Sequence, residues 1–458
     1  MSTITAGILI TSDGILHNQK SDHISKYLIK ELNSLRYNVG KITVVPEQVN
    51  VISNELEFMV KNCDLIITVG GMKCSNIYKA IGGIISQELE QSSELVKILE
   101  EIREPYDDDD IFIPIQAKIL SGYVYPVIHF QRIFILNEKH YKKSFPEILK
   151  AHLVQYRQEK SFRKVFRIIK NGNANRDLQE IDKLSNNCVK FEFSKDDKFF
   201  IFKISSRELS HMIEFEQKIR NKFNSHKLDV IDDSDVWEII YASKESHVRN
   251  TIENIEKCLK QCGLENIFLS FNGGKDCTVL LHLILVVIKK KYSNFTKPIF
   301  CLYVQSDSPF PEQDEFISQC QLYYNLEVVT IKSGIKDALQ QTLLKYPHYK
   351  ACFMGTRRTD PYSSSLQVFQ MTDPNWPQIM RVSPLLDWHY SDIWDYLLFY
   401  KVPYCKLYDM GYTSLGNTVN TTKNPSLIYH DQFDGKEMYL PAYKLLKETK
   451  ERNGRDSS

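Results

Sequence analysis

One short stretch of the chain combines glycines, a cation and a carboxylate. It reads Asn-Gly-Gly-Lys-Asp-Cys and begins at Asn272. Gly273 and Gly274 allow a tight turn that brings backbone N–H groups up to an anion. Lys275 adds a full positive charge, and Asp276 adds a carboxylate of the kind that binds Mg²⁺. The stretch therefore predicts a site for phosphate groups.

The residues around this stretch are of the kind that would position it. Residues 267–269 are apolar and predict a buried strand, and residues 278–285 predict a buried helix. A helix that begins at the turn contributes unpaired N–H donors and a partial positive charge. The order of residues differs from the Walker pattern, which has four residues between its first glycine and Gly-Lys-Ser/Thr. The alternative is a glycine turn that only joins a strand to a helix.

A second group of polar residues reads Gly-Thr-Arg-Arg-Thr-Asp-Pro and begins at Gly355. Arg357 and Arg358 can grip phosphate oxygens in a fork geometry that lysine cannot reproduce. Asp360 precedes a proline, which favours an extended backbone at this point. Alternatively, an arginine here is a surface ion-pair partner.

A third group lies farther along the chain. Asp373, Trp376 and Arg381 precede the stretch Pro-Leu-Leu-Asp-Trp at residues 384–388. A tryptophan can stack on a flat aromatic ligand, although it can equally be part of a core. Because these residues all follow a phosphate-binding stretch, their combination favours a nucleotide site.

The elements between these groups predict an open parallel sheet. Apolar runs at residues 299–304, 326–331 and 351–354 predict strands, and helical segments separate them. Ligands of such sheets bind beyond the carboxyl ends of the strands. The phosphate-binding stretch and the second group both fall at that edge.

The rest of the chain predicts two further parts. Residues 1–151 alternate strands with helices, which indicates a second α/β domain with a parallel sheet. Residues 152–235 predict a small α+β connector, and residues 236–458 form the third part. The basic residues 160–170 lack a recognisable nucleic-acid module, so we expect them to form a solvated helix face.

Composition sets outer limits on function. The 458 residues include 43% hydrophobic residues, which is ordinary for a soluble globular protein. The formal net charge of +1 gives no global field that would favour a nucleic-acid or membrane partner. The ten cysteines show no zinc-ligand spacing and indicate reduced thiols in the cytoplasm. We expect no signal peptide and no membrane span. Composition leaves the oligomeric state open.

The three groups, taken in order, resemble eukaryotic FAD synthases, also called FMN adenylyltransferases. The resemblance covers about residues 236–458, and the catalytic domain of that family is similar in fold to phosphoadenylyl-sulfate reductases. Residues 1–151 resemble the molybdopterin-binding-type domain. In that family paired acids follow the turn that corresponds to Gly70-Gly71, and here they are missing. This departure from the family pattern predicts a degenerate first domain, and the sequence leaves open whether that domain retains any hydrolase activity.

The resemblance implies the reaction of FMN with ATP to give FAD and pyrophosphate, with Mg²⁺ as cofactor. It implies catalytic roles for Asn272, Lys275, Asp276, Arg358 and Asp360, with Asp276 on the metal. It implies ligand-binding roles for Gly273, Gly274, Gly355, Arg357, Asp373, Trp376, Arg381, Arg452 and Arg455.

Three alternatives remain open. An adenylyl-sulfate reductase would need a nucleophilic cysteine near the C-terminus, but the last cysteine is Cys405. A tRNA-modifying ATP pyrophosphatase would need an RNA-binding module. A catalytically inactive flavin-binding protein would not need Lys275 and Asp276.

Overall fold

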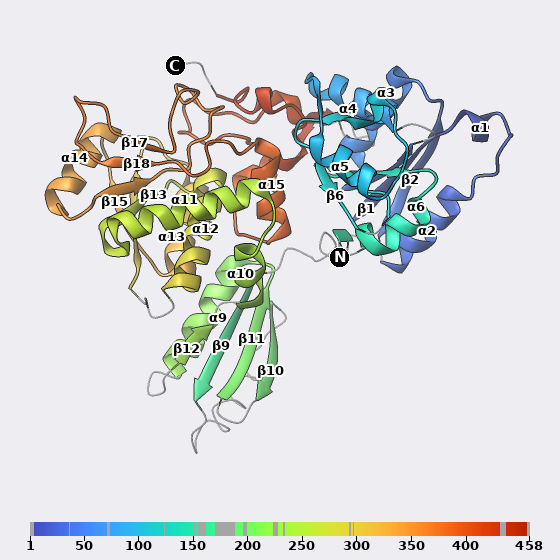
Figure 1. Cartoon of the computed structure of the whole chain (residues 1–458). Helices are drawn as coiled ribbons and strands as arrows, with labels where there is room; N and C mark the ends of the chain where they lie inside the picture. Colours follow the sequence, from blue (N-terminus) through green and yellow to red (C-terminus); the bar gives the residue numbers. More distant parts are fainter. Residues whose placement is uncertain are drawn as a thin grey trace. The chain divides into compact units, whose positions relative to one another are not determined.

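The computed structural model (Figure 1) describes most of the chain. The described residues are 4–35, 37–70, 74–122, 124–150, 152–153, 162–169, 188–195, 199–222, 228–231, 234–292, 295, 297–430 and 437–455. The chain divides into two compact units. Unit 1 comprises Met1–Gln158 and Asn424–Asn453, and unit 2 comprises Glu159–Lys423 and Gly454–Ser458.

Unit 1 is built on a six-stranded sheet of order β2-β1-β3-β8-β7-β6. Its strands are β1 (Thr5–Thr11), β2 (Asn38–Val45), β3 (Leu65–Gly70), β6 (Lys118–Leu120), β7 (Val127–Phe130) and β8 (Ile133–Asn137), with a separate pair of β4 (Leu89–Gln91) and β5 (Phe112–Pro114). Its helices are α1 (Asp13–Leu16), α2 (Ile24–Ser34), α3 (Val49–Asn62), α4 (Ser75–Ile85), α5 (Ser93–Glu101) and α6 (Tyr141–Ser144), followed by a π-helical turn over Phe145–Leu149. The first four strands pair in parallel and the last two antiparallel.

Alternation along β1 explains why helices cover both faces of this sheet. Ile8 and Ile10 lie in one apolar cluster with residues of α2, whereas Leu9 lies in a second cluster with residues of α3 and α4. Successive strand residues point to opposite faces, so an apolar run must be covered twice. The expected parallel α/β architecture of this part is confirmed. Gly71 lies outside the described residues.

The C-terminal part of unit 1 comes from Asn424–Asn453. It contains the short antiparallel pair of β19 (Ile428–His430) and β20 (Glu437–Tyr439) and 3₁₀ turns at Pro425–Leu427, Ala442–Lys444 and Glu448–Lys450. The compact units therefore divide the chain differently from the three consecutive domains expected from the sequence. The boundaries near residues 151 and 235 stay predictions.

Unit 2 begins with a four-stranded antiparallel sheet of order β10-β11-β9-β12. Its elements are β9 (Phe162–Ile169), β10 (Val189–Lys195), β11 (Phe199–Ser206), α9 (Leu209–Lys222) and β12 (Leu228–Ile231), and α9 lies along the sheet (Figure 1). The expected solvated helix at 160–170 is wrong, because β9 is a strand inside the sheet. Lys164 is buried and pairs with the buried Glu216 of α9. This basic residue therefore faces the interior and not the solvent.

The second sheet of unit 2 has the order β15-β14-β13-β16-β18-β17. Its strands are β13 (Ile267–Ser270), β14 (Ile299–Val304), β15 (Leu326–Ile331), β16 (Ala351–Phe353), β17 (Phe369–Met371) and β18 (Met380–Val382). All neighbours pair in parallel except β17 and β18. The expected open parallel sheet is confirmed, with β18 and β17 as additional strands.

Helices flank this second sheet. They are α10 (Ser234–Tyr241), α11 (Ser246–Cys262), α12 (Lys275–Lys291), α13 (Pro311–Tyr324), α14 (Ile335–Lys345) and α15 (Tyr390–Phe399). The apolar run that follows Lys275 is buried throughout, because α10, α11 and α15 all pack against α12. Within the part of the chain that the structure describes, no helix combines the length and the apolar character needed to cross a membrane.

Candidate functional site

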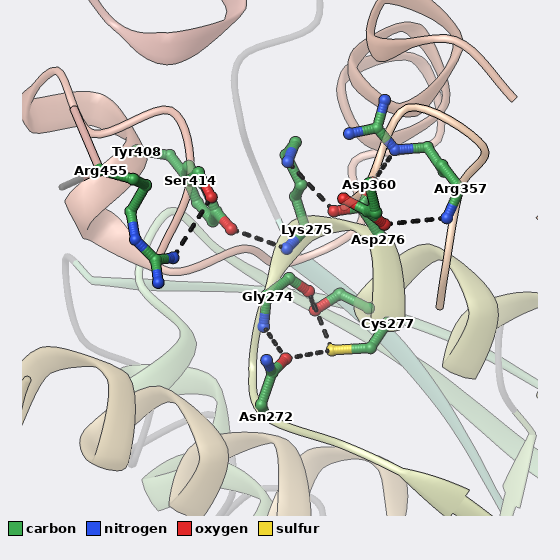
Figure 2. A network of polar contacts seen from close by, with 11 residues as sticks. Asn272, Gly274, Lys275, Asp276, Cys277, Arg357, Asp360, Tyr408, Ser414 and Arg455 are labelled. Carbon is green, nitrogen blue, oxygen red and sulfur yellow. Dashed lines mark hydrogen bonds and ion pairs between the residues drawn. The ribbon is translucent and has the colours of Figure 1, made fainter. Parts of the chain in front are cut away.

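The turn between β13 and α12 follows the carboxyl end of β13 and contains Asn272, Gly273 and Gly274. Figure 2 shows Asn272 and Gly274 at the start of α12, beside Lys275. We call residues 272–276 the phosphate loop. Gly273 has φ +70°, and a Cβ there would lie 3.0 Å from Cγ1 of Ile317 on α13. Both the backbone angle and the space therefore require glycine at this position.

Two amides of the phosphate loop donate to protein oxygens. Gly274 N donates to Oδ1 of Asn272 at 3.0 Å, and Lys275 N donates to the hydroxyl of Tyr408 at 2.9 Å. Burial, followed by the nearby Asp276, raises the pKa of Tyr408 well above its ordinary value, so this hydroxyl stays neutral. Asn272 and Tyr408 thus fix the shape of the turn, and the cations around it supply the charge.

A cluster of three charges stands at the start of α12. Asp276 lies between two cations, with Oδ2 3.0 Å from Lys275 Nζ and Oδ1 2.7 Å from Arg357 Nε. Burial raises the pKa of Asp276, but Arg357 and then Lys275 outweigh it, and the pKa lies below the ordinary 3.8. Arg357 is completely buried and Lys275 almost so. Two positive charges against one carboxylate leave the start of the helix cationic.

Gly355 explains how Arg357 reaches this position. A Cβ at Gly355 would lie 2.7 Å from the backbone nitrogen of Cys277 and 2.9 Å from its Cα. Only glycine permits the chain that leaves β16 to pass so close to the first turn of α12. Arg357 then lies beside Asp276 (Figure 2).

Arg358 and Asp360 organise the loop that follows β16. Asp360 Oδ2 accepts from Arg357 N at 2.9 Å. Arg358 pairs with Asp387 and donates to the carbonyls of Ser364 and Leu366. The two adjacent arginines therefore have different surroundings: Arg357 is buried beside the phosphate loop, and the Arg358 side chain is 39% exposed.

Asp373, Trp376 and Arg381 come together on the β17–β18 hairpin. Trp376 N donates to Asp373 O at 2.9 Å, and Arg381 Nη2 lies 3.9 Å from Asp373 Oδ1. The indole packs against the apolar cluster that includes Phe300, Leu302 and Ile379. Met380 pairs with Ala351, the first residue of β16, so the turn that carries Asp373 and Trp376 leads into the amino end of β18. The phosphate loop instead follows the carboxyl end of β13, so the strand register does not bring the turn to the same edge of the sheet.

Arg452 and Arg455 fall in different units. Arg452 belongs to unit 1, whereas Arg455 belongs to unit 2 and forms an isolated β-bridge with Thr421. The guanidinium of Arg455 donates to Ser414 Oγ at 3.5 Å, and a Cβ on Gly416 would lie 2.3 Å from its Nη2. Figure 2 shows Arg455 and Tyr408 on one side of Lys275 and Arg357 on the other.

Two supporting residues had no sequence signal. Tyr408 lies in a 3₁₀ turn (Lys406–Met410) far along the chain from the amide it contacts. Gln313 on α13 is buried, and its Nε2 donates to the backbone oxygen of Asn272 at 2.6 Å. Both contacts depend on the tertiary fold, so no local pattern could have identified them.

The thiols near the site are unreactive in character. Burial raises the pKa of Cys277 to about 12 and that of Cys405 to about 11. A nucleophilic cysteine needs a lowered pKa. No group of three or more His, Cys, Asp or Glu residues suited to a metal ion occurs among the described residues.

Comparison with known proteins relates both halves of the chain to described families. Residues 7–129 match the family described as probable molybdopterin binding domain, and residues 266–345 and 335–423 match the phosphoadenosine phosphosulfate reductase domain. The chain is 30% identical to the "Probable FAD synthase" of Caenorhabditis elegans over 99% of this chain and 97% of that protein. It is 40% identical to the "Probable FAD synthase" of Schizosaccharomyces pombe over 42% of this chain and 73% of that protein.

A solved structure is similar to about half of this chain. It is the FMN adenylyltransferase of Candida glabrata with FMN and the ATP analogue AMPCPP, which is 27% identical, covers 48% of this chain and 99% of that one, and has a TM-score of 0.43. The match to the worm protein spans nearly the whole of both chains. This chain belongs to the FAD synthase family.

Proposed function

We propose that this protein transfers the adenylyl group of ATP to FMN, giving FAD and pyrophosphate. A phosphate oxygen of FMN attacks the α-phosphorus of ATP, and the bond to the bridging oxygen of the β-phosphate breaks. The observation that carries the proposal is the cationic phosphate loop, with Lys275 and Arg357 around Asp276, in a chain of the FAD synthase family.

The reaction needs charge neutralisation more than a general base. The attacking phosphate is already anionic, so the barrier lies in bringing two polyanions together and in stabilising the leaving pyrophosphate. Fixed cations and positioned donors meet both needs. We assign Asn272, Gly273, Gly274 and Lys275 to the phosphates of ATP.

Asp276 also fits one ligand position of a magnesium ion. Its two oxygens each face one cation, and a carboxylate oxygen has a second lone pair available. Mg²⁺ in nucleotide sites takes one or two carboxylates together with substrate phosphates, so a single carboxylate beside the loop suffices. The ion would supply further positive charge to the transferring phosphate. The buried Arg357 would orient Asp276 rather than touch substrate.

The hairpin residues are suited to the flavin. Trp376 offers an aromatic face, and Arg381 and Asp373 lie beside it with one cation and one acceptor. Stacking on a flat ring is the use of tryptophan that this position favours. We assign Arg358 and Asp360 to the shape of the loop that follows β16, and Gly355 to the close packing of that loop on α12. We assign Arg455, which lies in the same unit as the phosphate loop, to phosphates. The phosphate-binding role expected for Arg452 stays a prediction.

The reductase and inactive-protein alternatives are less consistent with the chain. The last cysteine, Cys405, is buried and has a raised pKa, which does not suit a nucleophile. Lys275 and Asp276 are both present and paired. All ten cysteines lie within the described residues and are free, which is consistent with our proposal of a cytoplasmic location.

The test is to incubate the purified protein with FMN, ATP and Mg²⁺ and to separate the flavins. We expect FAD to accumulate with equal pyrophosphate. Asp276→Asn should lower the rate at least about 100-fold at a temperature at which the variant is still folded. Its melting temperature should also fall, because Lys275 and Arg357 lose the counter-charge between them. The variant keeps the shape of the side chain and removes its charge. Wild-type turnover by Asp276→Asn would contradict the assignment.

A further inference from the structure

The chain does not stay in unit 2 to its end. It leaves that unit after Lys423, contributes Asn424–Asn453 to unit 1 and returns at Gly454. We call residues 441–453 the return segment. Chain ends are normally poorly ordered unless they are held by packing or hydrogen bonds. The contacts that hold this segment are therefore informative.

Two buried basic side chains attach the return segment to unit 1. Arg132, just before β8, donates from Nη2 to Tyr443 O at 2.6 Å, and its guanidinium lies 5.5 Å from the centre of the Tyr443 ring. Lys444 donates from Nζ to Cys63 O at 2.7 Å and lies 3.2 Å from Asp64 Oδ1. Both residues are 8% exposed. A buried polar group is costly without its hydrogen-bond partners, so these contacts favour the attached arrangement of the segment.

Apolar and peripheral contacts extend the attachment. Leu446 packs against the apolar cluster that α3 and α4 share with the sheet, and Ala442 and Leu445 are buried. Gln116 donates to Glu448, and Lys447 donates to Ser86 Oγ at 2.8 Å. The return segment is therefore held by packing, by buried charges and by surface contacts of unit 1.

The residues that follow immediately are fixed within unit 2. Thr422 N donates to Gly454 O at 2.8 Å, and Thr421 forms the bridge with Arg455. The Arg455 guanidinium occupies the space over Gly416 that a Cβ would fill. Arg455 is thus the point at which a tail held by unit 1 re-enters the unit that carries the phosphate loop.

We propose that unit 1 contributes to adenylyl transfer by anchoring the return segment and so positioning Arg455 for the substrate phosphates. Arg132 and Lys444 are then positioning residues that act through Arg455. The proposal rests on the proposed function, and it assigns the N-terminal unit a role that requires no catalysis of its own. If the anchor is lost, ordering the released tail costs free energy at each turnover.

The test is a double-mutant cycle in the full-length protein, with initial rates of FAD formation. Arg132→Ala leaves the return segment itself unchanged, so its effect on catalysis must pass through the contact. We expect kcat/KM to fall roughly 5- to 50-fold, with Arg132→Lys partly restoring it. Arg455→Ala should lower kcat/KM at least as much. In the Arg455→Ala background, adding Arg132→Ala should lower kcat/KM almost no further, because Arg132 is proposed to act only through Arg455.

A second readout does not depend on activity. Trypsin cleavage after Lys447, Lys450 or Arg452 should be slow in the wild type and at least tenfold faster in Arg132→Ala, as expected for a released segment. Lys20→Ala, which breaks an exposed ion pair with Glu138, is the control and should change neither rate. Faster cleavage without loss of activity, or losses that multiply in the double variant, would overturn the proposal. If the wild type made no FAD, the proposed function would fail, and unchanged cleavage in Arg132→Ala would separately refute the anchor.

Discussion

The two parallel sheets of this protein each follow a central strand with a helix, and the first residues of the two helices differ. In unit 1, β3 ends at Gly70, and α4 begins at Ser75 with buried residues that include Ile77 and Tyr78. In unit 2, β13 leads through the phosphate loop into α12, whose first residues are Lys275 and Asp276. The order of strand and helix is common to both sheets, and the charges in the first turn of the helix are not.

This difference shows that a strand followed by a helix does not by itself make a site. A Cβ at Gly70 would lie 2.9 Å from Cys74 Sγ, so the glycine of unit 1 serves packing between the strand and the helix. Gly355 of unit 2 also serves close packing, but the packing there brings Arg357 beside Asp276. The two glycines thus differ in which side chains their close packing brings together, and only the packing at Gly355 brings charged side chains together.

The largest expected effect comes from removing the charge that distinguishes the two helix starts. Lys275→Ala should lower kcat/KM for FAD synthesis by roughly 10³-fold, because a fixed cation at the developing charge is lost. The matched change in unit 1 is Lys79→Ala on α4, which breaks an exposed ion pair with Asp109. It should leave kcat/KM within about twofold of wild type. Comparable losses of kcat/KM in both variants would show that the charge on α12 has no special role in catalysis.

The next effect tests close packing at a glycine. Gly355→Ala puts a Cβ against backbone atoms of Cys277, which cannot move aside. We expect displacement of the first turn of α12 and a loss of about 100-fold in kcat. Gly83→Ala is the control: Gly83 lies on α4 with no atom within 4 Å of the new Cβ, and alanine there should raise the free energy of unfolding by about 0.5–1 kcal/mol. Full activity in Gly355→Ala would argue against the packing explanation.

A smaller effect separates the two substrates within unit 2. Trp376→Ala should raise KM for FMN about tenfold and KM for ATP less than twofold, because the indole would stack on the flavin ring. Steady-state kinetics with each substrate varied in turn would measure both values. Trp376→Phe keeps an aromatic face and should retain most of the affinity. Equal changes for both substrates would assign Trp376 to packing alone.

Removal of the Tyr408 hydroxyl should have a modest effect on kcat/KM. Tyr408→Phe removes the acceptor for Lys275 N and nothing else, so we expect kcat/KM to fall about 3- to 10-fold, the value of one hydrogen bond. Tyr404→Phe is a suitable control, because that hydroxyl contacts Asp409 in the same region. If only the melting temperature changed, Tyr408 would support the fold without shaping the loop.

The last effect concerns the stability of unit 1 rather than catalysis, and it depends on pH. Burial, and then Arg132, lower the pKa of Lys444 from 10.5 to about 7, against the opposing effect of Asp64. Between these values the unfolded chain holds a proton that the folded chain has released. The free energy of unfolding therefore gains a contribution that rises with pH from about 7 to 10.5, with a slope approaching about 1.4 kcal/mol per pH unit. The same contribution is lost as the pH falls from about 10.5 to about 7, and below 7 Lys444 is protonated in both states.

Lys444→Met should remove that contribution while Asp64 and Arg132 remain. Denaturant unfolding of both proteins across this pH range would measure the difference between their slopes. Parallel curves would show that Lys444 keeps an ordinary pKa.

Much of the fold could be predicted because its signals are local. The strands 299–304 and 326–331 are apolar runs between helical segments, and the structure has β14 and β15 at those residues. β9 could not be predicted, because its buried Lys164 depends on an ion pair with Glu216, which lies 52 residues later in the chain. The sequence of a short basic segment does not indicate that a distant carboxylate will pair with one of its residues.

The sequence predicts which residues belong to the candidate site, but it does not predict their burial or their contact partners. Arg357 and Arg358 are adjacent and chemically identical, so no pattern could indicate that one is buried against Asp276 and the other pairs with Asp387. The contact of Tyr408 with the phosphate loop likewise depends on the tertiary fold. The return of the chain to unit 1 also has no signature in the sequence, because it depends on where Arg132 and Lys444 meet their partners.

The most direct measurement follows the phosphorus atoms of ATP. The protein should be incubated with FMN, Mg²⁺ and ATP that carries a radioactive label on either its α- or its γ-phosphorus. The account predicts that the α-label appears in FAD and the γ-label in pyrophosphate, and that both transfers disappear in Lys275→Ala. Release of the γ-label as inorganic phosphate would contradict the account. So would the appearance of the α-label in free AMP instead of FAD.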